Sequence, residues 1–159
     1  LGRACGLTDQ ALQARELSAQ LHDIGKFSIP WHILNKTSAL DEAEYNIIKT
    51  HPQVGHDILK DCEYLLNVSE VILQHHERMD GRGYPHGLMG GAISLHARIL
   101  TITDAFDAMT TNRPYRSHCM THEEASREIL RCAGTQFDPE LAVLFAGIVQ
   151  RGDLQAGTP

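Results

Sequence analysis

Cysteines are few in this chain, and their placement excludes several kinds of protein. The four, Cys5, Cys62, Cys119 and Cys132, have no CxxC spacing and are too sparse for a secreted scaffold held by disulfides. A metal site built from thiolates is not indicated either, because such sites draw on closely spaced cysteine pairs. We therefore expect reduced thiols in a cytoplasmic domain.

Long apolar runs and an excess of positive charge are also lacking. No stretch approaches the roughly 18 apolar residues that a membrane-spanning helix needs. Lysine and arginine number 14 against 20 aspartates and glutamates, a net charge of −6, so we expect no binding to the DNA backbone. A small anionic substrate is compatible with this balance if bound metal ions supply the positive field.

Strand-like alternation of apolar and polar residues is absent, whereas helical periodicity recurs along the chain. At 159 residues and 42% hydrophobic content, the sequence is long enough for one domain with a buried core. We expect an all-α domain over residues 1–150 and a flexible tail over residues 151–159.

Capping residues and prolines mark where the helices begin. The first helix is capped by Thr8 or Asp9 and ends at Gly25. This placement puts His22 and Asp23 in its last turn. Further helices are predicted to begin at Asp41, Pro52, Ser94, Thr121 and Asp138, the one after Thr121 ending at Gly134.

Two segments are predicted to lack helix. Residues 27–40 contain Pro30 and form a connection, and residues 78–93, rich in glycine, form a long loop. Four aromatic residues are expected in the core: Phe27, Trp31, Phe106 and Phe145.

Histidines and aspartates recur at positions that folding could bring together. They are His22, Asp23, His51, His75, His76 and Asp104. The long intervals between them each fit one helix plus one connection, as in metal sites built in the core of helical bundles. Imidazole nitrogens and carboxylate oxygens suit Zn, Mn, Fe or Ni. We therefore expect a metal centre made from side chains of several helices.

The pair His75-His76 places a condition on the helix that carries it. Adjacent helical residues diverge by about 100°, because a turn has about 3.6 residues. Both imidazoles can reach one metal only if the helix ends or distorts there. The glycines that begin at Gly81 favour such an end.

These residues belong to a longer ordered pattern. The chain contains His22-Asp23-Ile24-Gly25-Lys26, His51, His75-His76-Glu77-Arg78, Asp80-Gly81-Arg82-Gly83-Tyr84-Pro85, Thr103-Asp104-Ala105-Phe106-Asp107-Ala108-Met109-Thr110, Arg113-Pro114-Tyr115-Arg116 and Gly134-Thr135-Gln136-Phe137-Asp138-Pro139. From about Leu1 to Val149 it resembles the HD-GYP family of bacterial phosphodiesterases, which cleave cyclic di-GMP. The resemblance implies an HD-fold helical bundle with a long Gly-rich loop that carries the Gly-Tyr-Pro residues. It also implies hydrolysis of cyclic di-GMP to linear pGpG, to GMP or to both, in second-messenger signalling.

Two or three divalent metal ions, with Fe or Mn favoured, follow from the same resemblance. Asp23 can bridge two cations with its two oxygens, and such a pair activates a shared water and stabilises an in-line displacement at phosphorus. The other ligands would divide into His22 and Asp104 for one ion and His51, His75 and His76 for the other. Asp23 and Lys26 are the residues expected to carry catalysis.

Several residues are expected to contact the substrate. Lys26, beside the presumed metal centre, is expected to hold a phosphoryl oxygen. Arg113 and Arg116 are expected to bind the other phosphate or a guanine edge. Tyr84 could stack on a base or meet a partner protein, and Asp107 could orient a ligand histidine or contact substrate. Glu77 and Arg78, by contrast, are expected to form a local surface pair.

One part of the family pattern is not found. HD-fold phosphohydrolases take an additional histidine from a helix well before the His-Asp pair, and HD-GYP members use a glutamate there to hold a third metal. Upstream of His22 the candidates are Asp9 and Glu16. We interpret the chain as an N-terminally truncated HD-GYP domain that, in the full-length protein, follows a sensory or receiver domain.

The sequence leaves alternative functions open. The first is a metal-dependent cyclic di-GMP phosphodiesterase, which the intact ligand set favours. The second is a catalytically weak module that binds the nucleotide, or other signalling proteins through residues 78–93, which the missing upstream histidine favours. A third, a hydrolase of another nucleotide, is disfavoured by the Gly-Tyr-Pro loop and by the Arg113–Arg116 segment.

Overall fold

The structure, a computed structural model, describes residues 1–111 and 119–154 of the chain. Within these residues the regular secondary structure is helical, and β pairing is limited to two isolated bridges. The expected all-α class is confirmed. The α-helices are α1 (Asp9–Leu21), α2 (Trp31–Leu34), α3 (Glu42–Ile48), α4 (His51–Leu59), α5 (Leu66–Gln74), α6 (Leu95–Thr110), α7 (His122–Arg131) and α8 (Pro139–Gln150). The 3-10 helices are η1 (Ile24–Ser28), η2 (Glu63–Leu65) and η3 (Gly90–Ala92).

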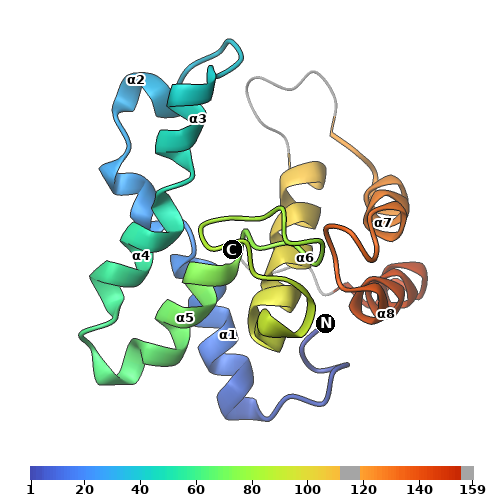
Figure 1. Ribbon diagram of the computed structural model, residues 1–159. Helices are drawn as coiled ribbons and strands as arrows, with labels where there is room; N and C mark the ends of the chain where they lie inside the picture. The colour runs from blue at the N-terminus through green and yellow to red at the C-terminus, as the bar shows by residue number, and fades with distance from the viewer. Residues whose placement is uncertain (112–118, 155–159) are drawn as a thin grey trace.

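Helix α6 occupies the middle of the molecule (Figure 1). Helices α1, α4 and α5 lie on one side of it, and α7 and α8 lie on the other. The largest buried cluster joins Ile99 and Ile102 of α6 to Ile129 of α7 and Phe145 of α8. This packing fixes α6 between the two groups of helices.

Side-chain caps begin several of the helices, as the sequence predicted. Thr8 accepts a hydrogen bond from the Ala11 amide at the start of α1, and Ser94 does the same for Ala97 in α6. Full capping boxes, in which the N3 glutamate also accepts from the cap amide, open α3 and α7. These local hydrogen bonds explain why the helix starts could be found from sequence.

The segment 27–40 is more ordered than expected. It contains the end of η1 and all of α2. Phe27 and Trp31, which we expected in the core, are 95% and 77% exposed. Ile29 and Ile33 take the buried positions instead, at 6% and 5% exposure.

Two helices end earlier than predicted. Helix α1 stops at Leu21, so His22 and Asp23 lie just beyond it, and α7 stops at Arg131. Gly134, the predicted end of α7, lies in the turn that follows and has a φ of 79°. This left-handed conformation costs glycine little.

The start of the predicted tail is hydrogen bonded to α8. The amide of Asp153 donates to the Ile148 carbonyl at 3.2 Å. Leu154 packs against the cluster formed by α6, α7 and α8. Residues 155–159 lie outside the described part of the chain. Across residues 1–111 and 119–154, we find no helix with the length and apolar content needed to cross a bilayer.

Candidate metal centre

All six residues that we expected to hold metal come together in the structure. The Nε2 atom of His22 lies 3.4 Å from Oδ1 of Asp104 and 3.5 Å from Oδ2 of Asp23. The other oxygen of Asp23 lies 3.6 Å from Nε2 of His51. Nε2 of His51 in turn lies 3.3 Å from Nε2 of His75, whose ring centroid is 4.0 Å from that of His76. Asp23 therefore stands between the two groups of candidate ligands.

The ends of helices place most of these side chains. His22 and Asp23 follow α1, and His51 is the first residue of α4. Helix α5 ends at Gln74, immediately before His75 and His76. The helix thus ends where the sequence required it to, and the two adjacent imidazoles can converge. Ligand atoms of His51, His75 and His76 lie within 4.8 Å of one another.

Gly25 allows η1 to approach α4 closely. A Cβ atom added at Gly25 would lie 1.9 Å from the His51 carbonyl oxygen and 2.7 Å from the Gly55 amide nitrogen. Any side chain at this position would therefore push η1 away from α4. Since Asp23 precedes η1 and His51 begins α4, the glycine is needed to bring Asp23 and His51 together.

Backbone hydrogen bonds fix the tautomers of three histidines. In each of them Nδ1 lies close to the carbonyl oxygen three residues earlier, at 2.6 Å for His22, 2.7 Å for His51 and 2.6 Å for His75. A carbonyl oxygen only accepts, so Nδ1 must carry the proton. In the neutral imidazole Nε2 then has a free lone pair. Metal-binding histidines are commonly held in this way by a bond from the other ring nitrogen.

The Nε2 atoms of His51 and His75 face each other without a proton to share. Both rings donate through Nδ1. When the rings are neutral, the two Nε2 atoms, 3.3 Å apart, are therefore both hydrogen-bond acceptors and their lone pairs face each other. Two acceptors at this distance repel, and a cation between them would replace the repulsion with two favourable bonds. The donor set therefore fits a divalent metal ion.

Burial keeps these imidazoles neutral. It lowers the pKa of His75 to about 4, and it lowers the pKa values of His51 and His76 as well. Neutral imidazole is the form that binds a metal, so the three histidines can bind an ion without first losing a proton near pH 7.

His22 lies in a more acidic environment. Burial opposes its protonation, but the hydrogen bond with Asp104 and the charge of Asp23 together raise the pKa of His22. Burial also disfavours ionisation of Asp104, yet the interactions with His22 dominate and lower the pKa of that carboxyl. Two carboxylates and one imidazole therefore form an anionic group that can accept a cation.

Lys26 lies at the open side of the centre. Its Nζ atom donates to Oδ2 of Asp23 at 2.7 Å, and the two side chains are 33% and 40% exposed. The lysine is one 3-10 turn beyond Asp23, which brings both side chains to one face of η1. An anion that approaches Asp23 from solvent would thus meet the Lys26 ammonium group.

Tyr84 covers the histidines from the segment between α5 and α6. Its ring stacks on His76 with centroids 4.8 Å apart and lies 6.4 Å from the ring of His51. Burial raises the pKa of the Tyr84 hydroxyl, so this group stays protonated. Tyr84 is therefore already in contact with the candidate ligands.

Glu77 is the functional residue that the sequence analysis missed. We expected a surface pair with Arg78, but Glu77 is 1% exposed and accepts hydrogen bonds from the amides of His86 at 2.7 Å and Leu88 at 2.9 Å. Arg78 pairs with Asp80 instead. Glu77 directly follows the His75-His76 pair, and this position was the available signal. Its carboxylate holds the residues that follow Tyr84 against the end of α5.

The remaining residues singled out in the sequence are exposed or lie outside the described part of the chain. Asp107 is exposed on α6 and accepts a hydrogen bond from the Thr111 hydroxyl at 3.1 Å. Asp9 and Glu16 are exposed on α1. Arg113 and Arg116 lie outside the described residues.

A cavity next to Tyr84 opens beside the metal centre. We call it the Tyr84 pocket, and its volume is about 420 Å³. Its lining residues are Asn46, Lys49, Thr50, Gln53, Val54, Tyr84, Pro85 and His86.

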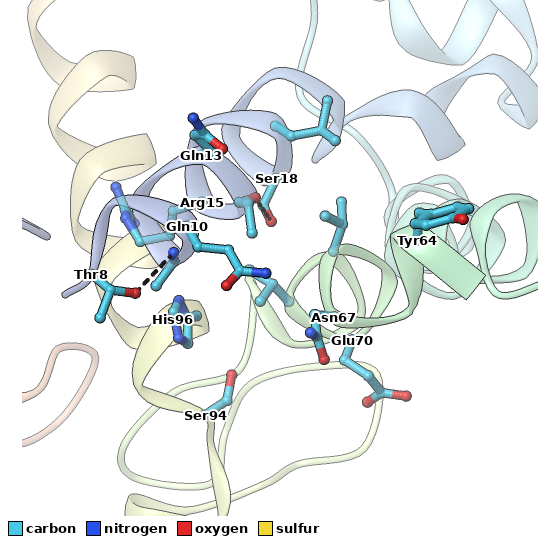
Figure 2. Close-up of a pocket in the computed structure, with 15 residues that line it drawn as sticks. Thr8, Gln10, Gln13, Arg15, Ser18, Tyr64, Asn67, Glu70, Ser94 and His96 are labelled. Carbon is cyan, nitrogen blue, oxygen red and sulfur yellow. Dashed lines mark hydrogen bonds between the residues drawn. The ribbon is translucent and has the colours of Figure 1, made fainter. Parts of the chain in front are cut away.

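A larger cavity of about 690 Å³ lies between α1, α5 and the start of α6, where Gln10, Asn67, Glu70 and His96 are among its polar lining residues (Figure 2). It contains none of the candidate ligands.

Residues 1–141 match the model of the HD domain family, so the chain belongs to that family. Two curated relatives are cyclic di-GMP phosphodiesterases. One, the response regulator RpfG of Xanthomonas campestris, is 41% identical over 136 residues, which cover 84% of this chain and 36% of the relative. The other, PA4108 of Pseudomonas aeruginosa, is 40% identical over 150 residues, which cover 94% of this chain and 36% of the relative. The resemblance to HD-GYP proteins is thereby confirmed.

A solved structure shares the fold. A cyclic GMP-AMP specific phosphodiesterase of Vibrio cholerae superposes with a TM-score of 0.71 at 22% identity, covering 96% of this chain and 41% of that one. The chain spans about a third of the length of the curated relatives named above.

Proposed function

We propose that this domain hydrolyses cyclic di-GMP as the metal-dependent phosphodiesterase part of a longer signalling protein. The observation that carries the proposal is the group of unprotonated imidazole nitrogens that face one another and the Asp23 carboxylate. A pure adaptor has no chemical need for such a group. The relatives that act on cyclic di-GMP supply the substrate.

Two divalent ions would fit the two groups of ligands, with a third possible only if a ligand comes from elsewhere. We propose His22 and Asp104 for one ion, His51, His75 and His76 for the other, and Asp23 for both. Iron or manganese suits this mixture of nitrogen and oxygen ligands. When bound, such a pair supplies the positive charge that activates water and stabilises a phosphoryl transition state.

The protein side chains have separate tasks in this proposal. Asp23 would hold the ions and already accepts a hydrogen bond from Lys26, whose ammonium group would donate to a phosphoryl oxygen of the substrate. Tyr84 excludes water from one side of the histidines, and Glu77 positions the backbone after Tyr84. Arg113 and Arg116 are proposed to bind the second phosphate or a guanine edge. The products are linear pGpG, GMP or both.

The wider setting is also proposed. A sensory or receiver domain would precede this one in the full-length protein, and other signalling proteins would bind through residues 78–93. A cytoplasmic location agrees with the unpaired thiols of the four cysteines.

The test is hydrolysis of cyclic di-GMP by the manganese- or iron-loaded protein and by Asp23→Ala. We expect turnover by the parent and a loss greater than about 100-fold in the variant, because Asp23 contacts both ligand groups. Asp57→Ala, an exposed aspartate of α4, is the matched control and should retain activity. If metal-loaded parent protein binds cyclic di-GMP without hydrolysing it, the domain is a nucleotide-binding module and the proposed activity is wrong.

A further inference from the structure

The Tyr84 pocket shares its walls with the metal centre. Tyr84 stacks on His76, and Thr50, another lining residue, immediately precedes His51. The pocket therefore adjoins the candidate ligands through Tyr84 and through the Thr50-His51 peptide. At about 420 Å³ the pocket is much larger than a phosphate group needs and is within the range of small-molecule sites.

The lining of the pocket combines flat surfaces with hydrogen-bonding groups. Tyr84, Pro85 and His86 supply rings. Asn46 and Gln53 supply amides that can both donate and accept, and no carboxylate is among the lining residues that the structure describes. Rings for stacking and amides for a base edge are the groups that proteins use to bind an unpaired nucleobase.

Lys49 gives the pocket its only charged amine among the described lining residues. Its Nζ atom lies 5.0 Å from the centroid of the Tyr45 ring, which helps to hold the ammonium group in place. An ammonium group only donates hydrogen bonds. Guanine presents two acceptors, O6 and N7, on one edge, whereas adenine presents the N6 amino donor in place of O6.

We propose that the Tyr84 pocket binds one base of a cyclic dinucleotide and that Lys49 makes it prefer guanine over adenine. The inference rests on the proposed function, which it deepens by naming a specificity-determining residue. A solved relative of the same fold is specific for cyclic GMP-AMP, so base identity differs among the substrates of such proteins. Lys26 already provides an ammonium group for the phosphate, which leaves Lys49 for the base.

The test compares the affinities of cyclic di-GMP and cyclic di-AMP, which differ only in their bases. Dissociation constants for both are measured by calorimetry on metal-loaded protein carrying Lys26→Gln, which should slow turnover while keeping every proposed metal ligand, with and without Lys49→Gln. We expect Lys49→Gln to reduce the preference for cyclic di-GMP about tenfold, mainly by weakening that ligand. Lys60→Gln, an exposed lysine at the end of α4, should leave the preference unchanged.

Two results would overturn the assignment of Lys49. An equal loss of affinity for both dinucleotides would mean that Lys49 contacts their common phosphates or riboses, and an unchanged preference would mean that no base reaches it. Both are distinct from failure of the proposed function, which would appear as absence of cyclic di-GMP hydrolysis by the metal-loaded parent itself, whether or not that protein binds the nucleotide.

Discussion

His75 is fully buried and donates through Nδ1, so its protonation state is tied to folding. Its pKa is lowered to about 4 in the folded protein by burial, against an ordinary value near 6.5. Between these pH values the unfolded chain binds a proton that the folded chain does not. The free energy of unfolding of the metal-free protein must therefore fall as the pH drops from about 6.5 to about 4.

We expect His75 alone to contribute about 3 kcal/mol to this acid destabilisation. The measurement is urea unfolding of metal-free protein at pH 7.5 and at pH 4.5, followed by circular dichroism. His75→Gln should show a smaller loss between the two pH values, whereas His32→Gln, exposed on α2, should behave like the parent. Equal losses for His75→Gln and the parent would show that His75 is protonated in the folded state.

Individual ligand candidates could be predicted from sequence, while the roles of their neighbours could not. His22, Asp23 and Asp104 carry imidazole or carboxylate groups, which can bind metal ions, so their residue types alone make them candidates. Glu77 differs, because its partners are the amides of His86 and Leu88, and any residue except proline offers an amide. Only the folded path of the backbone identifies such a partner.

The segment between α5 and α6 depends on one carboxylate. The Glu77 carboxylate accepts hydrogen bonds from two backbone amides. A glutamine at position 77 would turn its NH2 group toward one of these amides, which would then have no hydrogen-bond acceptor. We expect Glu77→Gln to lower the free energy of unfolding by about 1–3 kcal/mol and to speed amide exchange at residues 84–88. Glu70→Gln, exposed on α5, is the control.

Metal content distinguishes a positioning role from a general loss of structure. Glu77→Gln should retain its metal ions, because Glu77 contacts backbone amides and not the candidate ligands. Loss of metal at unchanged exchange rates in residues 84–88 would contradict the role given to Glu77.

Helix α8 is attached to α6 through Asp138. The carboxylate caps α8 by accepting from the amides of Glu140 at 2.9 Å and Leu141 at 3.1 Å, and it also accepts from Arg98 of α6 at 2.6 Å. Its side chain is only 9% exposed. Asp138→Ala removes the cap and leaves a partly buried arginine unpaired, and we expect a loss of about 2–4 kcal/mol in urea unfolding.

The N-cap of α3 provides a control for the loss of stability expected from Asp138→Ala. Asp41→Ala removes an exposed cap from α3 without an inter-helix ion pair and should cost only about 1 kcal/mol. Similar losses for Asp41→Ala and Asp138→Ala would mean that the bond to Arg98 adds nothing.

Helix starts were predictable because caps act within a few residues, but α2 was not. It is only four residues long, too short for a periodic pattern to show. Ile33 of α2 is nevertheless buried, at 5% exposure, in the folded chain.

Over the whole molecule, the candidate ligands come from one side of the bundle and from α6. Helices α7 and α8 pack on α6 and on each other, but they contribute no ligand candidate among the described residues. The all-α class was predictable from the lack of strand-like alternation. The arrangement of the two groups about α6 was not, because helix packing depends on the shapes of whole helix surfaces.

Removing metal should therefore affect the two groups unequally. We expect a chelator to speed amide exchange at the ends of α1 and α5 and at the start of α4, where ligands would be released from their ions. Exchange in α8 should change little. A uniform increase across α1 to α8 would show that the molecule opens as one unit and that metal stabilises all of it.

The exposure of Trp31 determines how unfolding of this molecule can be observed. Trp31 is the only tryptophan of the chain, and 77% of it already faces solvent in the folded state. Its emission spectrum should thus shift little toward the red when the chain unfolds, and intrinsic fluorescence would miss most of the transition. Circular dichroism, which follows the loss of helix, is therefore the better signal for unfolding of this all-α chain.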